Sequence, residues 1–197
     1  MSPHHSTTEV DVPPPVRAGN HGLTVDGSAL RSALRPHAAG VAVLTAAGAA
    51  GPVGVTVTSL TSVSATPALI SVALATVSNT WAEIRDCDWF GVQLLGADQA
   101  AVAQRFATRG IDRFARPTGW HLGPHGVPLI DACQSWMICS PYRQVELGDH
   151  HLMVGAVEHV ELGAPTGSLV HLHGSLEPVG PARPVADGPG ARPARRP

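Results

Sequence analysis

Lysine is absent from this chain of 197 residues, and all 13 basic residues are arginines. We interpret this as a drift in composition toward Ala, Gly, Pro and Arg, not as a functional signal. The formal net charge of −2 argues against a nucleic-acid-binding protein, because phosphate contacts need a basic face. No apolar run approaches the roughly 18 residues of a membrane-spanning helix, and residues 1–16 contain no apolar signal-peptide core. We therefore expect a soluble, cytoplasmic protein that binds neither nucleic acid nor membrane.

Cysteine is scarce, and the common cofactor and catalytic signatures are missing. Cys87, Cys133 and Cys139 are too few and too scattered for a disulfide framework, so we expect reduced thiols. There is no GxGxxG after a predicted strand, no GxxxxGK[ST] and no GxSxG, which argues against a Rossmann domain, a P-loop and a nucleophile elbow. Eleven histidines leave open a metal-assisted enzyme that uses His171 and His173, at i and i+2 on one strand face. HExxH and a CxxC pair are absent, however, and we expect no metal site.

The sequence predicts one folded segment between two tails. Residues 1–27 and 179–197 are predicted to be disordered because they hold too little apolar surface to order themselves, and residues 28–178 are predicted to form the domain. Helices are predicted over 28–36, over 79–87 and from Asp98 onward. The second helix would be capped by Thr80 with Glu83, or else by Ser78, and the third by Asp98. Strands are predicted over 40–45, 52–58, 68–75, 89–95, 132–145, 151–162 and 169–173. Many strands with three short helices indicate a mainly β barrel, not a parallel βαβ sheet.

Hydroxyl side chains are concentrated in residues 54–64, the run GVTVTSLTSVS. In the predicted strand 52–58 the valines alternate toward the core, while Thr56 and Thr58 project from the other side. Beyond Ser59 the alternation fails, so we expect a turn that exposes backbone N–H groups. Such donors suit the electron-rich ring of a flavin, whose reduced form gains negative charge near N1 and O2. The alternative is an ordinary strand with threonines on its solvent face.

Three further groups could carry chemistry, and each has a purely structural alternative. Residues 78–80 (Ser-Asn-Thr) open a predicted helix, where free N–H groups and hydroxyls can hold a phosphate or simply cap the helix. The group after the third helix, Arg109, Asp112, Arg113 and Phe114, could reach a ribityl phosphate or a nicotinamide dinucleotide through an arginine, or form a surface salt bridge. The turn GDHH, residues 148–151, could orient nicotinamide or move a proton, or be only a tight turn.

Taken in order, these segments resemble the flavin reductase-like family of FMN-binding split barrels. The matching segments are GVAVLTA, PVGVTVTSLTSVSATPALISVAL, SNTWAEIRDCDWFGVQLL, AQRFATRGIDRF and GDHHLMVGAVEHVE, and the match extends from about Leu30 to Gly174. The resemblance implies a Greek-key-like split β-barrel with peripheral helices. It also implies an NAD(P)H-dependent reductase of FMN, or of FAD in its place, with NADH or NADPH as co-substrate. Family members are usually homodimers with the flavin near the subunit interface, and many supply reduced flavin to a separate monooxygenase.

The resemblance further implies a role for each site residue. The flavin would be bound by Thr56, Val57, Thr58, Ser59, Ser62, Val63, Ser64, Ser78, Asn79, Thr80, Arg113 and Phe114. The first seven would follow the isoalloxazine and the ribityl chain, the next three would hold the phosphate, and the last two match the family's DRF-like segment. His150 would lie by the nicotinamide and is the predicted catalytic residue.

The sequence departs from the family pattern at three places. Gln93 stands where Asn is frequent, His37 replaces a usual aromatic before the first strand, and SLVHLHGSLEP replaces the common aromatic-rich, Arg-containing ending. The altered ending leaves open a second hypothesis, a flavin-binding or carrier protein, or a repurposed flavoenzyme, without turnover of free flavin.

Overall fold

The computed structural model describes residues 25–180, so the two predicted disordered tails lie almost entirely outside the described residues. Contacts divide the chain into two units, Met1–Leu34 and Arg35–Pro197, and each is described by itself. None of the helices within the described part has the length and hydropathy needed to span a bilayer.

The described part of the first unit holds one helix, α1 (Gly27–Leu34). The Asp26 carboxylate caps it, accepting hydrogen bonds from the amide and the hydroxyl of Ser28 at 2.8 and 2.6 Å. The helix ends before the predicted limit of residue 36 because Arg35 precedes a proline, a position that disfavours helical backbone.

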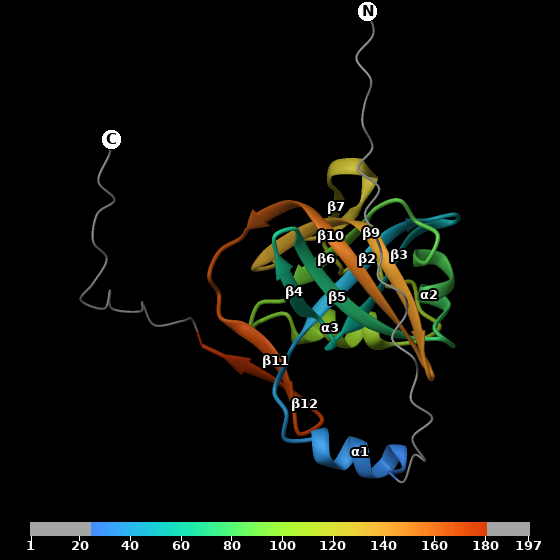
Figure 1. Cartoon of the computed structure of the whole chain (residues 1–197). Helices are drawn as coiled ribbons and strands as arrows, with labels where there is room; N and C mark the ends of the chain where they lie inside the picture. The colour runs from blue at the N-terminus through green and yellow to red at the C-terminus, as the bar shows by residue number, and fades with distance from the viewer. Residues whose placement is uncertain (1–24, 181–197) are drawn as a thin grey trace, which may run out of the picture. The chain divides into compact units, whose positions relative to one another are not determined.

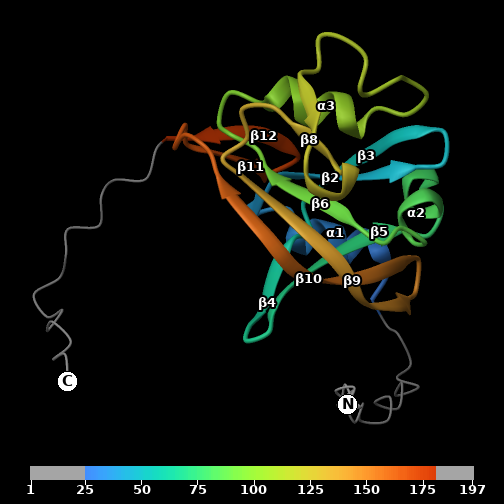
Figure 2. The ribbon, with the colours of Figure 1, turned by 90° about the horizontal axis from the view of Figure 1, so that it is seen from above.

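The second unit is built on an antiparallel seven-stranded sheet with the order β3-β2-β6-β9-β10-β5-β4. Its strands are β2 (Ala42–Gly48), β3 (Gly51–Val57), β4 (Thr61–Ala65), β5 (Ala68–Ala75), β6 (Phe90–Leu94), β9 (Ser135–Leu147) and β10 (His150–Leu162). Smaller sheets are formed by β1 (Ala39–Gly40) with β11 (Ser168–Leu172) and β12 (Ser175–Val179), and by β7 (Trp120–Leu122) with β8 (Pro128–Ile130). The long β9–β10 hairpin runs through the middle of the large sheet (Figures 1 and 2).

All seven predicted strands and all three predicted helices occur, and four strands were missed besides the short β1. The turn beyond Ser59 also occurs, but the chain then forms β4, which pairs with β5. The prediction missed β4 because its residues are mostly exposed and show no apolar alternation. The strands β7 and β8 have three residues each, too few for a periodic signal, and β12 is mostly exposed and contains a proline.

The helix caps differ in part from the prediction. At α2 (Asn79–Ile84) the cap is Ser78, whose hydroxyl accepts a hydrogen bond from the Trp81 amide at 3.4 Å, so the predicted Thr80–Glu83 capping box was wrong. At α3 (Ala100–Ala107) the predicted cap Asp98 was also wrong. The N-cap residue is Gln99, whose side chain makes no capping bond and instead accepts from the Gly96 amide and donates to the Asp131 carbonyl.

The two faces of the large sheet pack against different partners, as strand alternation requires. Leu44, Phe90, Met153 and the three valines of β3 belong to the cluster in the barrel interior, with α2. The outer face of β2 and β3 is covered by α3. Glycine is required at position 54 because α3 packs closely against β3: a Cβ there would lie only 2.8 Å from Cε1 of Phe106.

Gln93, the departure noted in the sequence, has a structural role. Its side chain is fully buried, and its Nε2 donates to the Thr45 hydroxyl at 2.8 Å. Thr45 in turn donates to the Pro128 carbonyl at 2.6 Å, and Oε1 of Gln93 accepts from the Ile130 amide at 3.3 Å. This network ties β8 to β2 and β6.

Candidate functional site

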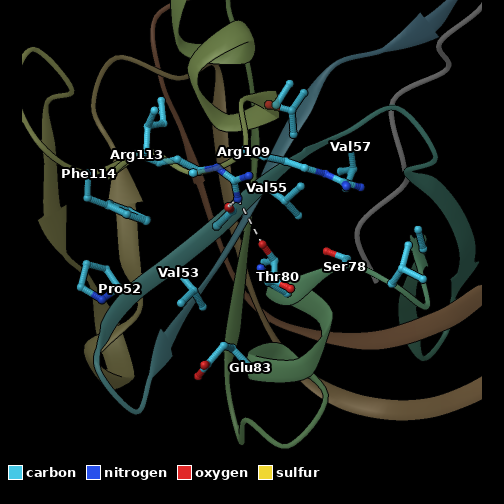
Figure 3. Close-up of a pocket in the computed structure, with 18 of the residues that line it drawn as sticks. Pro52, Val53, Val55, Val57, Ser78, Thr80, Glu83, Arg109, Arg113 and Phe114 are labelled. Atoms are coloured by element: carbon cyan, nitrogen blue, oxygen red, sulfur yellow. Dashed lines mark hydrogen bonds between the residues drawn. The ribbon is translucent and has the colours of Figure 1, made fainter.

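A groove of about 740 Å³ lies along the free edge of β3. The other walls are the end of β5, the segment that leads into α2, the loop after α3, and the start of β10. Figure 3 shows the valines of β3 in a row along the groove, with Thr80 and Glu83 of α2 below them and Arg109 and Arg113 above. The groove therefore gathers segments that lie up to about a hundred residues apart in the sequence, from Pro52 to His150.

The free edge of β3 presents backbone groups to this groove. The Gly54 carbonyl accepts a hydrogen bond from Nη1 of Arg113 at 2.5 Å, so it is turned away from β2. In an antiparallel strand the N–H and C=O of one residue point to the same side, and this side alternates along the chain. The backbone groups of Gly54 and Thr56 therefore face the free edge, and apart from the Gly54 carbonyl, which Arg113 occupies, they provide donors and acceptors for a planar polar ring.

The predicted hydroxyls of Thr56 and Ser59 are used to hold the protein together. The Thr56 hydroxyl donates to the Ala103 carbonyl of α3 at 2.7 Å, so it holds the helix to the outer face of β3 and its backbone is what faces the groove. The Ser59 hydroxyl donates to the Ala73 carbonyl at 3.0 Å and accepts from the Ala73 amide at 2.9 Å. Ser59 thereby connects the end of β3 to β5, where the two ends of the curled sheet approach each other.

Arg113 fixes the loop after α3 onto the groove. Besides the bond to Gly54, its Nη1 donates to the Thr80 hydroxyl at 3.1 Å, as the dashed line in Figure 3 marks. Its Nε and Nη2 donate to the Thr108 carbonyl at 3.0 and 2.9 Å. Burial, and then repulsion from Arg109, lowers the pKa of Arg113 from its ordinary value. The guanidinium thus joins β3, α2 and the loop in one positive corner beside Ser78 and Thr80.

His150 lines the groove at the start of β10, where it pairs with Ala75 at the end of β5 that leads into α2. Its Nδ1 is 2.7 Å from Oδ1 of Asp149. A carboxylate only accepts hydrogen bonds, so Nδ1 carries the hydrogen and Nε2 is left for a ligand. The Thr76 amide donates to the Asp149 carbonyl at 2.9 Å, and the His151 ring stacks on Trp81 with centroids 4.4 Å apart. These contacts fix the β9–β10 turn at the mouth of the groove.

Ten of the 13 predicted site residues line the groove: Thr56, Val57, Thr58, Ser59, Ser78, Asn79, Thr80, Arg113, Phe114 and His150. Ser62, Val63 and Ser64 do not; they lie on β4, at the other edge of the sheet. The prediction missed the small residues Ala73 and Ala75 and the rim residues Val77 and Ile111. No sequence pattern marks Val77 and Ile111, although both are large apolar side chains exposed at the rim.

The histidines and cysteines of the described residues form neither a metal site nor an activated nucleophile. Within residues 25–180 no group of three or more His, Cys, Asp or Glu side chains is placed to hold a metal ion. The predicted shared face of His171 and His173 is wrong, because His173 lies beyond β11 in a turn with φ of 53°. Burial raises the pKa of both Cys133 and Cys139 to about 12, so neither thiol is an activated nucleophile.

The fold and groove together define a split antiparallel β-barrel with a polar groove of nucleotide size along its open edge. The chain belongs to the flavin reductase-like domain family, whose model matches residues 34–180. This finding confirms the resemblance on which the predicted fold rested.

Similarity to characterised proteins extends over most of the chain. It is 36% identical over 155 residues to the NADH:FMN oxidoreductase of Rhodococcus qingshengii, covering 79% of this chain and 81% of the relative. It is 35% identical over 144 residues to the reductase component of a Rhodococcus opacus 4-nitrophenol 4-monooxygenase/4-nitrocatechol 2-monooxygenase, covering 73% and 76%. The crystal structure of BorF, the flavin reductase component of a bacterial two-component tryptophan halogenase, superposes with a TM-score of 0.73 at 34% identity, covering 80% of this chain and all of BorF.

Proposed function

We propose that this chain is a flavin reductase that oxidises a nicotinamide nucleotide and reduces FMN. The observation that carries the proposal is the single groove in which an open strand edge, a positive corner with hydroxyls and a histidine at the mouth come together. The activities named for the relatives support it, since they belong to chains that align with most of this one.

The groove fits a flavin mononucleotide in size and in chemistry. Its volume of about 740 Å³ falls in the range of sites that bury a small organic ligand. The edge groups of Thr56 match the donors and acceptors of the isoalloxazine, and Arg113 with Ser78 and Thr80 suits a phosphate. The carboxylate of Glu83 also lines the groove, but its Oε2 accepts from the Ala49 amide at 3.4 Å, on the side of the β2–β3 turn.

In this assignment the flavin would lie with its ring along residues 56–59 and its phosphate near residues 78–80 and Arg113, with Phe114 behind. A flavin held by these residues would supply a hydride-accepting ring for the nicotinamide, with the balancing proton coming from solvent. The backbone amides of β3 stabilise the negative charge that the reduced ring gains, because they are fixed before the reaction. Nε2 of His150 orients the nicotinamide from the mouth of the groove.

The proposal includes a homodimer and a partner enzyme. Ser62, Val63 and Ser64 lie outside the groove, and Val63 is 53% exposed on β4, so a second subunit is the element that could connect this strand to the flavin. One relative is the reductase component of a monooxygenase, and another is the flavin reductase component of a two-component halogenase. We infer that this chain likewise supplies reduced flavin to a separate flavin-dependent monooxygenase.

The test is a steady-state assay of the purified protein with NADH or NADPH and with FMN or FAD, following the loss of nicotinamide absorbance. We expect FMN-dependent oxidation, and the four combinations rank the two flavins and the two nicotinamides. Tight FMN binding with no oxidation of either nicotinamide would instead identify a carrier. The altered ending that motivated the carrier hypothesis forms β11 and β12, and none of its residues lines the groove.

A further inference from the structure

Arg109 lines the same groove as Arg113 but is bound differently. Its side chain is exposed at the rim, and within residues 25–180 its guanidinium makes no hydrogen bond and no ion pair. Arg113 is half-buried and donates four hydrogen bonds to the protein. A guanidinium has five N–H donors. Arg113 therefore shapes the groove, whereas Arg109 keeps its whole set of donors for a ligand.

The two guanidinium groups form an unneutralised pair. The charge of Arg109 contributes to the lowered pKa of Arg113, after burial, so the two groups are close enough to repel each other. The carboxylates nearby do not offset this repulsion with an ion pair to Arg109. Oδ1 of Asp112 accepts from the amides of Phe114 and Ala115, and Glu83 faces the β2–β3 turn. An anionic ligand is what would relieve the repulsion.

The side chains of the two arginines point to different parts of the groove, so each can bind a different anionic group. Arg113 points at Thr80, in the corner assigned to the flavin phosphate, whereas in Figure 3 the Arg109 side chain extends away from this corner in the direction of Val57. A nicotinamide that delivers hydride must lie on the solvent-facing side of the flavin ring, so the rest of its dinucleotide passes over the rim. Arg109 is exposed and lines the groove, so its side chain is accessible to this part of the dinucleotide.

We propose that Arg109 binds the pyrophosphate of the nicotinamide dinucleotide and does not bind the flavin. Its planar fork matches two phosphate oxygens at once, which gives both binding energy and orientation. This inference rests on the proposed flavin reductase function and adds to it the residue that recognises the second substrate.

The test compares Arg109→Ala with Arg143→Ala, which removes the same charge from an exposed arginine on β9 outside the groove. Two hydride donors are used: NADH, and 1-benzyl-1,4-dihydronicotinamide, which has no phosphate. In Arg109→Ala we expect kcat/KM for NADH to fall about 10- to 100-fold, the size of a lost charged hydrogen-bond pair. We expect little change for the phosphate-free donor, for the KM of FMN, or for any parameter in Arg143→Ala.

Several outcomes would overturn the inference. Equal losses with both donors would mean that Arg109 acts on the groove as a whole. Weaker binding of FMN but not of riboflavin would assign Arg109 to the flavin phosphate, and a loss confined to NADPH would assign it to the 2′-phosphate. Calorimetric titration with NAD⁺ is run in parallel. Absence of turnover in the wild type refutes the flavin reductase function, whereas unchanged NAD⁺ affinity in Arg109→Ala refutes only the role of Arg109.

Discussion

Replacing Arg113 by methionine removes the side chain that joins the loop after α3 to β3 and α2. Two of its four hydrogen bonds, to Gly54 and Thr80, are partly buried, and the two to Thr108 are exposed. Hydrogen bonds from a charged donor contribute about 1.5–3 kcal/mol each. We count only the partly buried pair at the lower value, because water screens the others, and expect unfolding free energy to fall by about 3 kcal/mol.

The measurement is urea unfolding followed by far-ultraviolet circular dichroism, with a thermal scan beside it. For a domain of this size the same loss lowers Tm by roughly 6–12 °C. Arg113→Lys keeps the charge but not the fork, so it should lie between wild type and Arg113→Met. Arg143→Met is the matched control on an exposed position of β9 and should unfold like the wild type. A loss below about 1 kcal/mol in Arg113→Met would refute the reasoning, because it is less than the contribution expected from even one hydrogen bond of a charged donor.

Three further changes test other parts of the molecule. His150→Ala should slow hydride transfer to FMN at least about 10-fold in stopped-flow experiments while the Kd of FMN stays nearly constant, and a parallel loss of both would contradict its place beside the nicotinamide. Gln93→Leu should lower the unfolding free energy by about 2–3 kcal/mol in urea, since the buried Ile130 amide loses its acceptor; an unchanged midpoint would contradict this. Because burial raises the pKa of Cys133 and Cys139 to about 12, the unfolded chain ionises its thiols first, so stability is complete below about pH 9 and declines as the pH rises toward 12. Urea midpoints at pH 8 and pH 10 check this sign, and Cys133→Ala/Cys139→Ala should show a smaller difference between them.

Much of the fold follows from local pattern. The alternation in β3 and the apolar run of β5 decide which side chains enter the barrel, and the three helices have periodic apolar positions. The strand β4 could not be found this way. Its pairing with β5 is set by the partner strand and by a register shift between Ser62 and Ser64, neither of which is written in its own residues.

The candidate site was predicted in its composition better than in its geometry. The resemblance named Arg113 and the residues around Thr56, and these segments do lie along one groove. The direction of each hydroxyl was not predictable, because the acceptor of Thr56 is the Ala103 carbonyl, 47 residues away. Arg109 could be listed from the sequence, but its lack of a partner within the described part is a tertiary fact.

The unpaired side of β3 has a consequence for the behaviour of the protein between catalytic cycles. A bare strand margin is a template on which a strand of another molecule can add itself, and proteins usually blunt such margins with charge or cover them. Here Arg113 occupies the Gly54 carbonyl, whereas the backbone groups of Thr56 lie on the side of β3 that pairs with no strand in the described part of the chain. A ligand in the groove would also cover this strand margin, so we expect ligand binding to protect the protein against edge-to-edge association.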